Sequence, residues 1–170
     1  RALRDVTERY GGEYFASAVG EVNVTAKMKE CGALIGGEGN GGVIYPALHY
    51  GRDAMVGVAL FLTNLAHRQM KVSELLKTYP QYVITKNRIE LSDKAMIDKI
   101  LSEMQKAYAG ENINTIDGVK ISFEEKKQWV HLRRSNTEPI IRIYAEAATK
   151  EAADALAAEV IGIAKKIIGR

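Results

Sequence analysis

The sequence predicts two globular halves, an α/β layer followed by an α+β unit in which two helices cover one face of a sheet. Helical and extended patterns alternate from Arg1 to about Lys77. Strands of period two and two amphipathic helices follow. Between the halves, Pro80 must end a short helix, because proline disfavours helix in the residue before it. We therefore expect one domain over residues 1–77 and a second over 78–170.

In the first half, the patterns predict helices at 2–10, 21–31 and 53–68, and strands at 13–19, 33–37 and 42–46. Asp53 is the predicted N-cap of the last of these helices. That helix is apolar nearly all round, so it is expected to lie buried in a real core. Ser73 is the predicted N-cap of the short helix before Pro80.

In the second half, the patterns predict helices at 94–108 and about 150–168, and strands near 81–91 and at 119–123, 128–134 and 139–146. Glu151 near the start of the closing helix and Lys166 near its end complement the helix dipole. Because side chains alternate along a strand, Leu132 should face the core, whereas Arg133 and Arg142 should share the open face.

Composition narrows the class of protein. The 170 residues are 46% hydrophobic and carry a net charge of +3. This charge is too small to attract a polyanion by itself. Cys31 is the single cysteine and the three histidines are scattered, so neither a disulfide nor a metal cluster is expected. The most apolar stretch, 54–66, is shorter than the roughly 20 residues of a membrane span. We expect a cytoplasmic protein without a membrane partner, and the abrupt helical start predicts a fragment.

A glycine-rich loop runs from Gly36 to Gly42, with five glycines in seven positions. Glycine permits φ > 0 and a close approach of a ligand to the backbone. Glu38 would repel an anion, but its carboxylate accepts hydrogen bonds from neighbouring hydroxyls, and Asn40 adds a donor and an acceptor. The loop suits a hydroxyl-rich ligand; the alternative is a flexible hairpin turn with a solvated glutamate.

A second polar loop joins the strands at 128–134 and 139–146. Its sequence is Arg133-Arg134-Ser135-Asn136-Thr137-Glu138-Pro139. Arginine binds phosphate bidentately, and Ser135, Asn136 and Thr137 supply further donors. Arg133 and Arg142 flank the turn on its open side, so the chemistry predicts a site for a phosphate dianion. The alternative is an asparagine-containing β-turn with charged shoulders.

Together these motifs resemble those of the α-D-phosphohexomutases. Gly37-Glu38-Gly39-Asn40-Gly41 resembles the G-E-x-S-G sugar loop of their third domain. Arg133-x-Ser135-Asn136-Thr137-Glu138-Pro139 resembles the R-x-S-[NG]-T-E-P phosphate loop of their fourth. Further matching pieces, in chain order, are Val19-Gly20, Gly51-Arg52-Asp53, and Arg142 with Glu146. The resemblance therefore spans essentially the whole chain.

The resemblance implies the C-terminal substrate-recognition part of a mutase that interconverts 1- and 6-phosphosugars through a bisphosphate. Its fold would be a truncated α/β third domain, a sheet with packed helices, followed by an α+β C-terminal domain like the TATA-box-binding protein. Arg133, Ser135, Asn136 and Thr137 would hold the phosphate of a hexose or hexosamine. Glu38 and Asn40 would hold sugar hydroxyls.

Family members carry their phosphoserine and an aspartate-rich Mg²⁺ loop in N-terminal domains that are missing from this sequence. We therefore expect no catalytic residue and no Mg²⁺ site in this chain, and no activity from it alone. Asn40 departs from the common serine, and Gly42 stands where many members have histidine.

The stretch 19–24 and the glycine-rich loop are most similar to the phosphoglucosamine mutase-like branch; the alternative is a phosphomannomutase/phosphoglucomutase. Glu21 near the sugar would suit an amino group, or it stabilises the dipole of its own helix. A hypothesis from another class is a non-enzymatic nucleic-acid-binding module, which the sequence pI of 8.9 motivates. Such a module needs a basic stripe with interleaved aromatics, and the sequence disperses its lysines and arginines.

Overall fold

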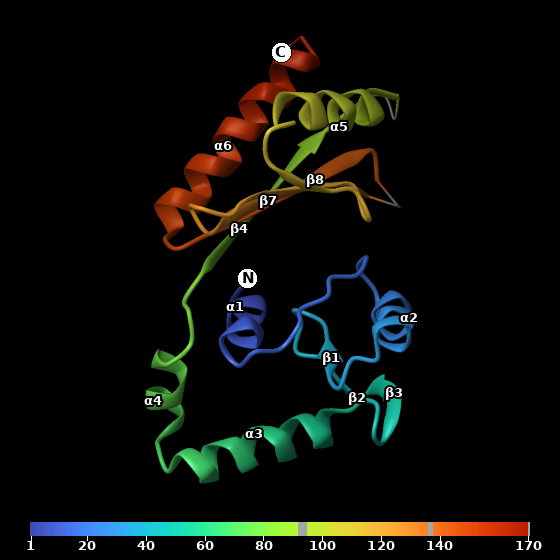
Figure 1. The fold of residues 1–170 in the computed structure, drawn as a ribbon. Coiled ribbons are helices and arrows are strands. Elements are labelled where there is room, and N and C mark those ends of the chain that lie inside the picture. The colour runs from blue at the N-terminus through green and yellow to red at the C-terminus, as the bar shows by residue number, and fades with distance from the viewer. Residues whose placement is uncertain (92–94, 136–137, 170) are drawn as a thin grey trace. The chain divides into compact units, whose positions relative to one another are not determined.

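A computed structural model describes residues 1–91, 95–135 and 138–169. The chain divides into two compact units, Ala2–Pro80, and Gln81–Arg170 together with Arg1. Figure 1 shows the elements of each unit along the colour gradient of the chain. We call them the N-terminal and the C-terminal unit.

The N-terminal unit contains four helices around a small sheet, in the order α1 (Ala2–Arg9), α2 (Glu21–Cys31), β1 (Gly36–Gly37), β2 (Val43–Tyr45), β3 (His49–Arg52), α3 (Ala54–Arg68) and α4 (Val72–Lys77). The three strands are antiparallel in the order β1-β2-β3, with Gly37 opposite Val43 and Ile44 opposite Arg52. The loop between β1 and β2 is the glycine-rich loop. This hairpin therefore positions the predicted sugar-binding residues.

The N-terminal unit buries few side chains, and the prediction of a real core there was wrong. Its buried hydrophobic residues are Met28, Ile44 and Leu75. Helix α3, which was predicted to be buried, has no buried residue, and Met55 is 77% exposed. An all-round apolar helix needs neighbours on every side, whereas α3 packs chiefly on β2, where Gly57 faces Val43.

Two further local predictions for the N-terminal unit need correction, and a third is confirmed. No strand forms at 13–19, because an extended segment becomes a strand only by pairing, and these residues pair with none of the described strands. Helix α4 begins earlier than predicted, so that Lys71 rather than Ser73 is the N-cap, and its N–H donates to the Glu74 carboxylate. Asp53 is confirmed as the N-cap of α3, because Oδ1 accepts from the N–H of Val56 at 3.0 Å.

The C-terminal unit is a five-stranded antiparallel sheet with two helices, in the order β4 (Val83–Glu90), α5 (Ala95–Ala107), β5 (Asn112–Asn114), β6 (Val119–Phe123), β7 (Gln128–Arg134), β8 (Ile140–Ala147) and α6 (Lys150–Ile167). The strand order is β4-β8-β7-β6-β5. Helices α5 and α6 lie on one face of the sheet (Figure 1), as predicted. The opposite face, which we call the open face, carries no helix of this unit.

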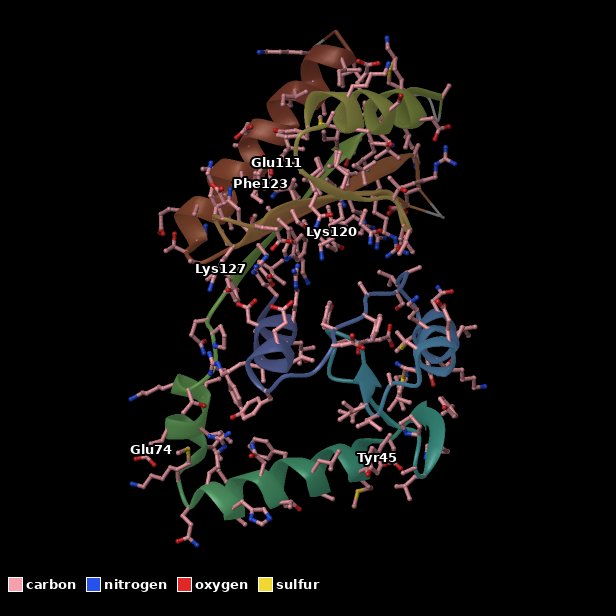
Figure 2. All side chains as sticks on the ribbon, viewed as in Figure 1. Tyr45, Glu74, Glu111, Lys120, Phe123 and Lys127 are labelled. Carbon is pink, nitrogen blue, oxygen red and sulfur yellow. The ribbon has the colours of Figure 1, made fainter. Side chains whose placement is uncertain are left out.

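Alternation along the strands directs one set of side chains into the core beneath α5 and α6. The fully buried strand residues include Ile121, Val130, Leu132, Ile141 and Ile143, and the helices contribute Ile97, Ile100, Met104 and Val160 to the same core. Full burial of one such side chain contributes about 1.5–3 kcal/mol. Figure 2 shows the same alternation in β6, where Phe123 and Lys120 lie on opposite sides of the sheet. The predicted fold class is confirmed, and β5, which sequence patterns missed, completes the sheet edge.

Candidate functional site

The predicted phosphate loop joins β7 to β8 and begins in a tight turn. The N–H of Ser135 donates to the carbonyl of Ile140 at 3.1 Å. Ser135 is a buried polar residue, and its Oγ accepts from the N–H of Glu138 at 3.4 Å. Asn136 and Thr137 lie outside the described residues. The turn thus places the loop between the ends of two strands that are anchored in the core.

The two consecutive arginines of the loop point to opposite faces of the sheet. Arg133 lies on the open face, and its Nε pairs with Oδ2 of Asp117 at 3.1 Å. Arg134 lies on the helix side, where Nη2 donates to both carboxylate oxygens of Asp98 at 3.1 Å. This is the register that the sequence alternation predicts: of these two arginines, only Arg133 lies on the open face.

Asp117 holds Arg133 from a turn that docks against β7. Gly118, at φ +85°, could not carry a side chain, because an added Cβ would lie 2.2 Å from the carbonyl oxygen of Leu132. The carbonyl of Asp117 lies 2.5 Å from Nε2 of His131, and burial lowers the pKa of that histidine. An Asp-Gly pair is a turn signal in a sequence. Its contact with Arg133 could not be foreseen, because the partner lies on a different strand.

Arg142 of β8 lies directly opposite Arg133 of β7. Like charges opposite one another destabilise a sheet pair. Among the residues that the structure describes, Arg142 has no ion-pair partner, so Asp117 neutralises only one of the two cations. An anionic ligand would compensate the remaining charge, that of Arg142.

The glycine-rich loop is closed by its own backbone. The N–H of Glu38 donates to the carbonyl of Gly42, and the N–H of Gly41 to the carbonyl of Glu38, both at 3.0 Å. Gly37 must lack a side chain, since an added Cβ would lie 2.2 Å from the Gly42 carbonyl oxygen. Oδ1 of Asn40 accepts from the N–H of Gly42 at 3.1 Å, so this acceptor serves the turn. The flexible turn considered from the sequence is therefore an organised hairpin loop.

Arg52 brings two of the predicted sugar-binding residues together. Its Nε lies 2.7 Å from Oε2 of Glu21, and its Nη1 lies 3.7 Å from Oε2 of Glu38. Glu21 is also the first residue of α2, where its carboxylate complements the helix dipole. The matched motif included Arg52, but its contact with Glu21 could not be predicted, because 31 residues separate the two in the sequence. The Glu38 side chain is 16% exposed, which places its carboxylate at the base of the loop.

No group of three or more histidine, cysteine, aspartate or glutamate side chains able to hold a metal occurs within 1–91, 95–135 and 138–169. No helix among the same residues is long and apolar enough to cross a membrane. The described geometry consists of two opposed arginines on the open face of the C-terminal sheet and a polar, glycine-lined hairpin loop in the N-terminal unit.

Family comparisons match both units. The phosphoglucomutase/phosphomannomutase alpha/beta/alpha domain III matches residues 1–82, and the C-terminal domain of the same family matches residues 87–163. The chain belongs to the phosphoglucomutase/phosphomannomutase family.

Similar curated proteins are archaeal. A phosphoglucomutase/phosphomannomutase of Thermococcus kodakarensis is 39% identical over 89% of this chain and 33% of its own length. A probable phosphoglucosamine mutase of Methanopyrus kandleri is 33% identical over 98% of this chain and 36% of its own. A phosphoglucosamine/phosphogalactosamine mutase of Sulfurisphaera tokodaii is 34% identical over the same shares. The chain spans about a third of the length of these relatives.

Among solved structures, a phosphoglucomutase/phosphomannomutase family protein of Burkholderia thailandensis matches with a TM-score of 0.76 and 27% identity. The match covers 98% of this chain and 35% of that protein. A putative phosphomannomutase of Thermus thermophilus matches with a TM-score of 0.63 and 25% identity, over 99% of this chain and 34% of that protein. The fold of both units is therefore the fold of this family.

Proposed function

We propose that the chain is the substrate-recognition part of a hexose-phosphate mutase that interconverts 1- and 6-phosphosugars through a bisphosphate intermediate. The observation that carries the proposal is the pair of opposed arginines on the open face, Arg133 and Arg142, of which Asp117 neutralises one. A phosphate dianion compensates the remaining charge and accepts bidentate hydrogen bonds from guanidinium groups. Membership of the family supports the same ligand.

In this proposal the phosphate is bound by Arg133, Ser135 and Arg142, together with Asn136 and Thr137 of the loop motif. Ser135 anchors the turn through its backbone, and Asp117 holds the Arg133 guanidinium by Nε. Holding an arginine by Nε orients its planar fork, so less conformational entropy is lost when phosphate binds.

The sugar is bound by Glu38, Asn40 and Glu21. Glu38 presents carboxylate oxygens to hydroxyls, and Asn40 contributes its amide nitrogen, because its oxygen serves the turn. Glu21 is engaged by Arg52, and an amino group on the sugar would share this carboxylate. We favour a phosphoglucosamine mutase over a phosphomannomutase/phosphoglucomutase. Relatives with both kinds of name match the chain.

The phosphoserine and the Mg²⁺ site that the family implies belong, in this proposal, to a part of the enzyme outside these residues. The described side chains contain no carboxylate cluster that fits Mg²⁺, so no step of the reaction is assigned to a metal here. We further propose domains at 1–77 and 78–170, a cytoplasmic location, and no mutase activity from the chain alone. Sustained, protein-dependent turnover in a coupled assay with Mg²⁺ and a bisphosphate activator would contradict the last point.

Calorimetric titration of the chain tests the recognition proposal. Glucosamine 6-phosphate is expected to bind, and glucosamine without phosphate is expected to bind far more weakly. The proposal fails if no phosphosugar binds, or if glucosamine binds as tightly as its phosphate. Tighter binding of mannose 6-phosphate than of glucosamine 6-phosphate would favour the phosphomannomutase alternative.

A further inference from the structure

The open face of the C-terminal sheet carries three arginines in one row. Arg88 of β4 lies opposite Arg142 of β8, which in turn lies opposite Arg133 of β7. Because neighbouring strands are about 4.8 Å apart, the two outer backbones are separated by about 10 Å across Arg142. Directly opposed like charges weaken a sheet. The row is therefore a feature that the stability of the fold alone does not explain.

Acidic groups neutralise only the two ends of this row. Arg133 pairs with Asp117 at 3.1 Å, and Nη2 of Arg88 lies 3.2 Å from Oε1 of Glu90. The Arg88 and Glu90 side chains are 65% and 73% exposed, and such surface pairs contribute little to stability. Within the described residues the central Arg142 has no acidic partner. Arg88 can therefore leave Glu90 for a stronger anion with little loss of stability.

A second row on the same face adds positive charge. In register across the strands, it consists of Lys86, Tyr144, His131 and Lys120. Nζ of Lys86 lies 5.7 Å from the ring centroid of Tyr144, and Nζ of Lys120 lies 4.4 Å from that of Trp129. Cations and aromatic rings that are dispersed in the sequence thus lie together on one face.

We propose that Arg88 extends the phosphate site beyond the loop motif, so that a phosphomonoester dianion is bound across Arg133, Arg142 and Arg88. Lys86, in the next row, contributes charge without a planar fork. This inference rests on the proposed function and deepens it, because it adds a β4 side chain to the recognition of the substrate phosphate. Charge complementarity selects the ligand: once Arg88 leaves Glu90, two of the three arginines lack an acidic partner among the described residues, and a dianion supplies two negative charges on oxygens that guanidinium groups bind bidentately.

Titration of Arg88→Gln with glucosamine 6-phosphate tests the inference. We expect the Kd to rise about 5- to 30-fold, because a partly exposed charge-assisted hydrogen bond is lost. Arg88→Lys should recover only part of the affinity, since it keeps the charge and loses the fork. Arg134→Gln is the matched control, because this exposed arginine pairs with Asp98 on the helix side. Its Kd should stay within about twofold of the unchanged protein.

Two further measurements separate the outcomes. If Arg133→Gln abolishes binding while Arg88→Gln leaves the Kd unchanged, the inference is wrong and the proposed function stands. If Arg133→Gln also leaves the Kd for glucosamine 6-phosphate unchanged, the proposed function itself fails. A single-stranded oligonucleotide provides the third outcome. If Arg88→Gln weakens only oligonucleotide binding, with a steep dependence on salt, the face serves nucleic acid and the inference is overturned.

Discussion

The two units support their candidate sites in different ways. In the C-terminal unit, a closed core beneath α5 and α6 fixes the strands that carry Arg133 and Arg142. In the N-terminal unit, the buried hydrophobic residues are Met28, Ile44 and Leu75, and the glycine-rich loop is held by its backbone and by Arg52. A site on rigid strands is organised before its ligand binds, whereas a loop with surface ion pairs can adapt to its ligand. If the proposed function is correct, the strand-borne arginines should supply most of the affinity, and the glycine-rich loop should adapt to the sugar.

The largest expected difference concerns stability. Leu132→Ala removes a fully buried side chain of β7 and should lower the unfolding free energy by about 2–5 kcal/mol. Leu62→Ala, in α3, removes a side chain that is 53% exposed and should change it by about 0.5 kcal/mol or less. Urea unfolding followed by circular dichroism measures both. An equal loss in the two variants would show that α3 is buried in solution and would break the comparison.

The next effect concerns the phosphate. In the complete mutase that we propose, Arg133→Ala should reduce kcat/KM roughly 10- to 100-fold, as one or two charge-assisted contacts are lost. Arg133→Lys should restore part of this loss. Arg134→Ala should have little effect, because this residue pairs with Asp98 on the helix side. A greater loss with Arg134→Ala, in variants that remain folded, would contradict the assignment.

A smaller effect is expected at the sugar loop. Glu38→Gln keeps the shape of the side chain and removes its charge, so kcat/KM for the phosphosugar should fall about tenfold in the same enzyme. The affinity for inorganic phosphate should not change, since the phosphate site lies in the other unit. Glu30→Gln is the control, because Glu30 is 70% exposed on α2. Equal losses in the two glutamate variants would remove Glu38 from the site.

The smallest effect is a dependence of stability on pH that arises from His131 in the C-terminal unit. Burial lowers the pKa of His131 below its ordinary value of 6.5, so the folded state binds fewer protons than the unfolded state. Its contribution to stability is therefore present above pH 6.5 and is lost as the pH falls below that value. His131→Gln should reduce the loss of stability between about pH 7 and 5. An unchanged pH dependence of urea unfolding would show that His131 does not titrate in this way.

How well the sequence predicted each unit follows from how each unit is stabilised. The strands Val119–Phe123 and Gln128–Arg134 formed at the predicted bounds, because each alternates over a closed core. In the N-terminal unit, the strand at 13–19 does not form and His49–Arg52 was missed. A short strand without a buried face forms only where it pairs with another strand. A period-two pattern in the sequence does not identify that partner.

In the candidate site, too, contacts between residues distant in the chain could not be predicted from the sequence. Motif chemistry alone predicted binding roles for Glu38, Asn40, Arg133 and Ser135, because each lies in a loop whose residue types are themselves distinctive. The contacts of Asp117, Arg52 and Arg88 could not be predicted, because their partners lie on other elements: Arg133, Glu21 and Arg142. Side-chain alternation nevertheless distinguished Arg133 from Arg134, since it depends only on neighbouring residues.

The sequence by itself determined the order of elements in the C-terminal unit apart from β5, the two polar loops, and the face on which each loop arginine lies. These properties follow from local periodicity and residue chemistry, which act over a few positions. Only the tertiary structure decided that Asp117 holds Arg133, that Arg52 joins Glu21 to Glu38, and that three arginines form one row. Strand order and register bring these groups together, and both are set by packing between residues that are distant in the chain.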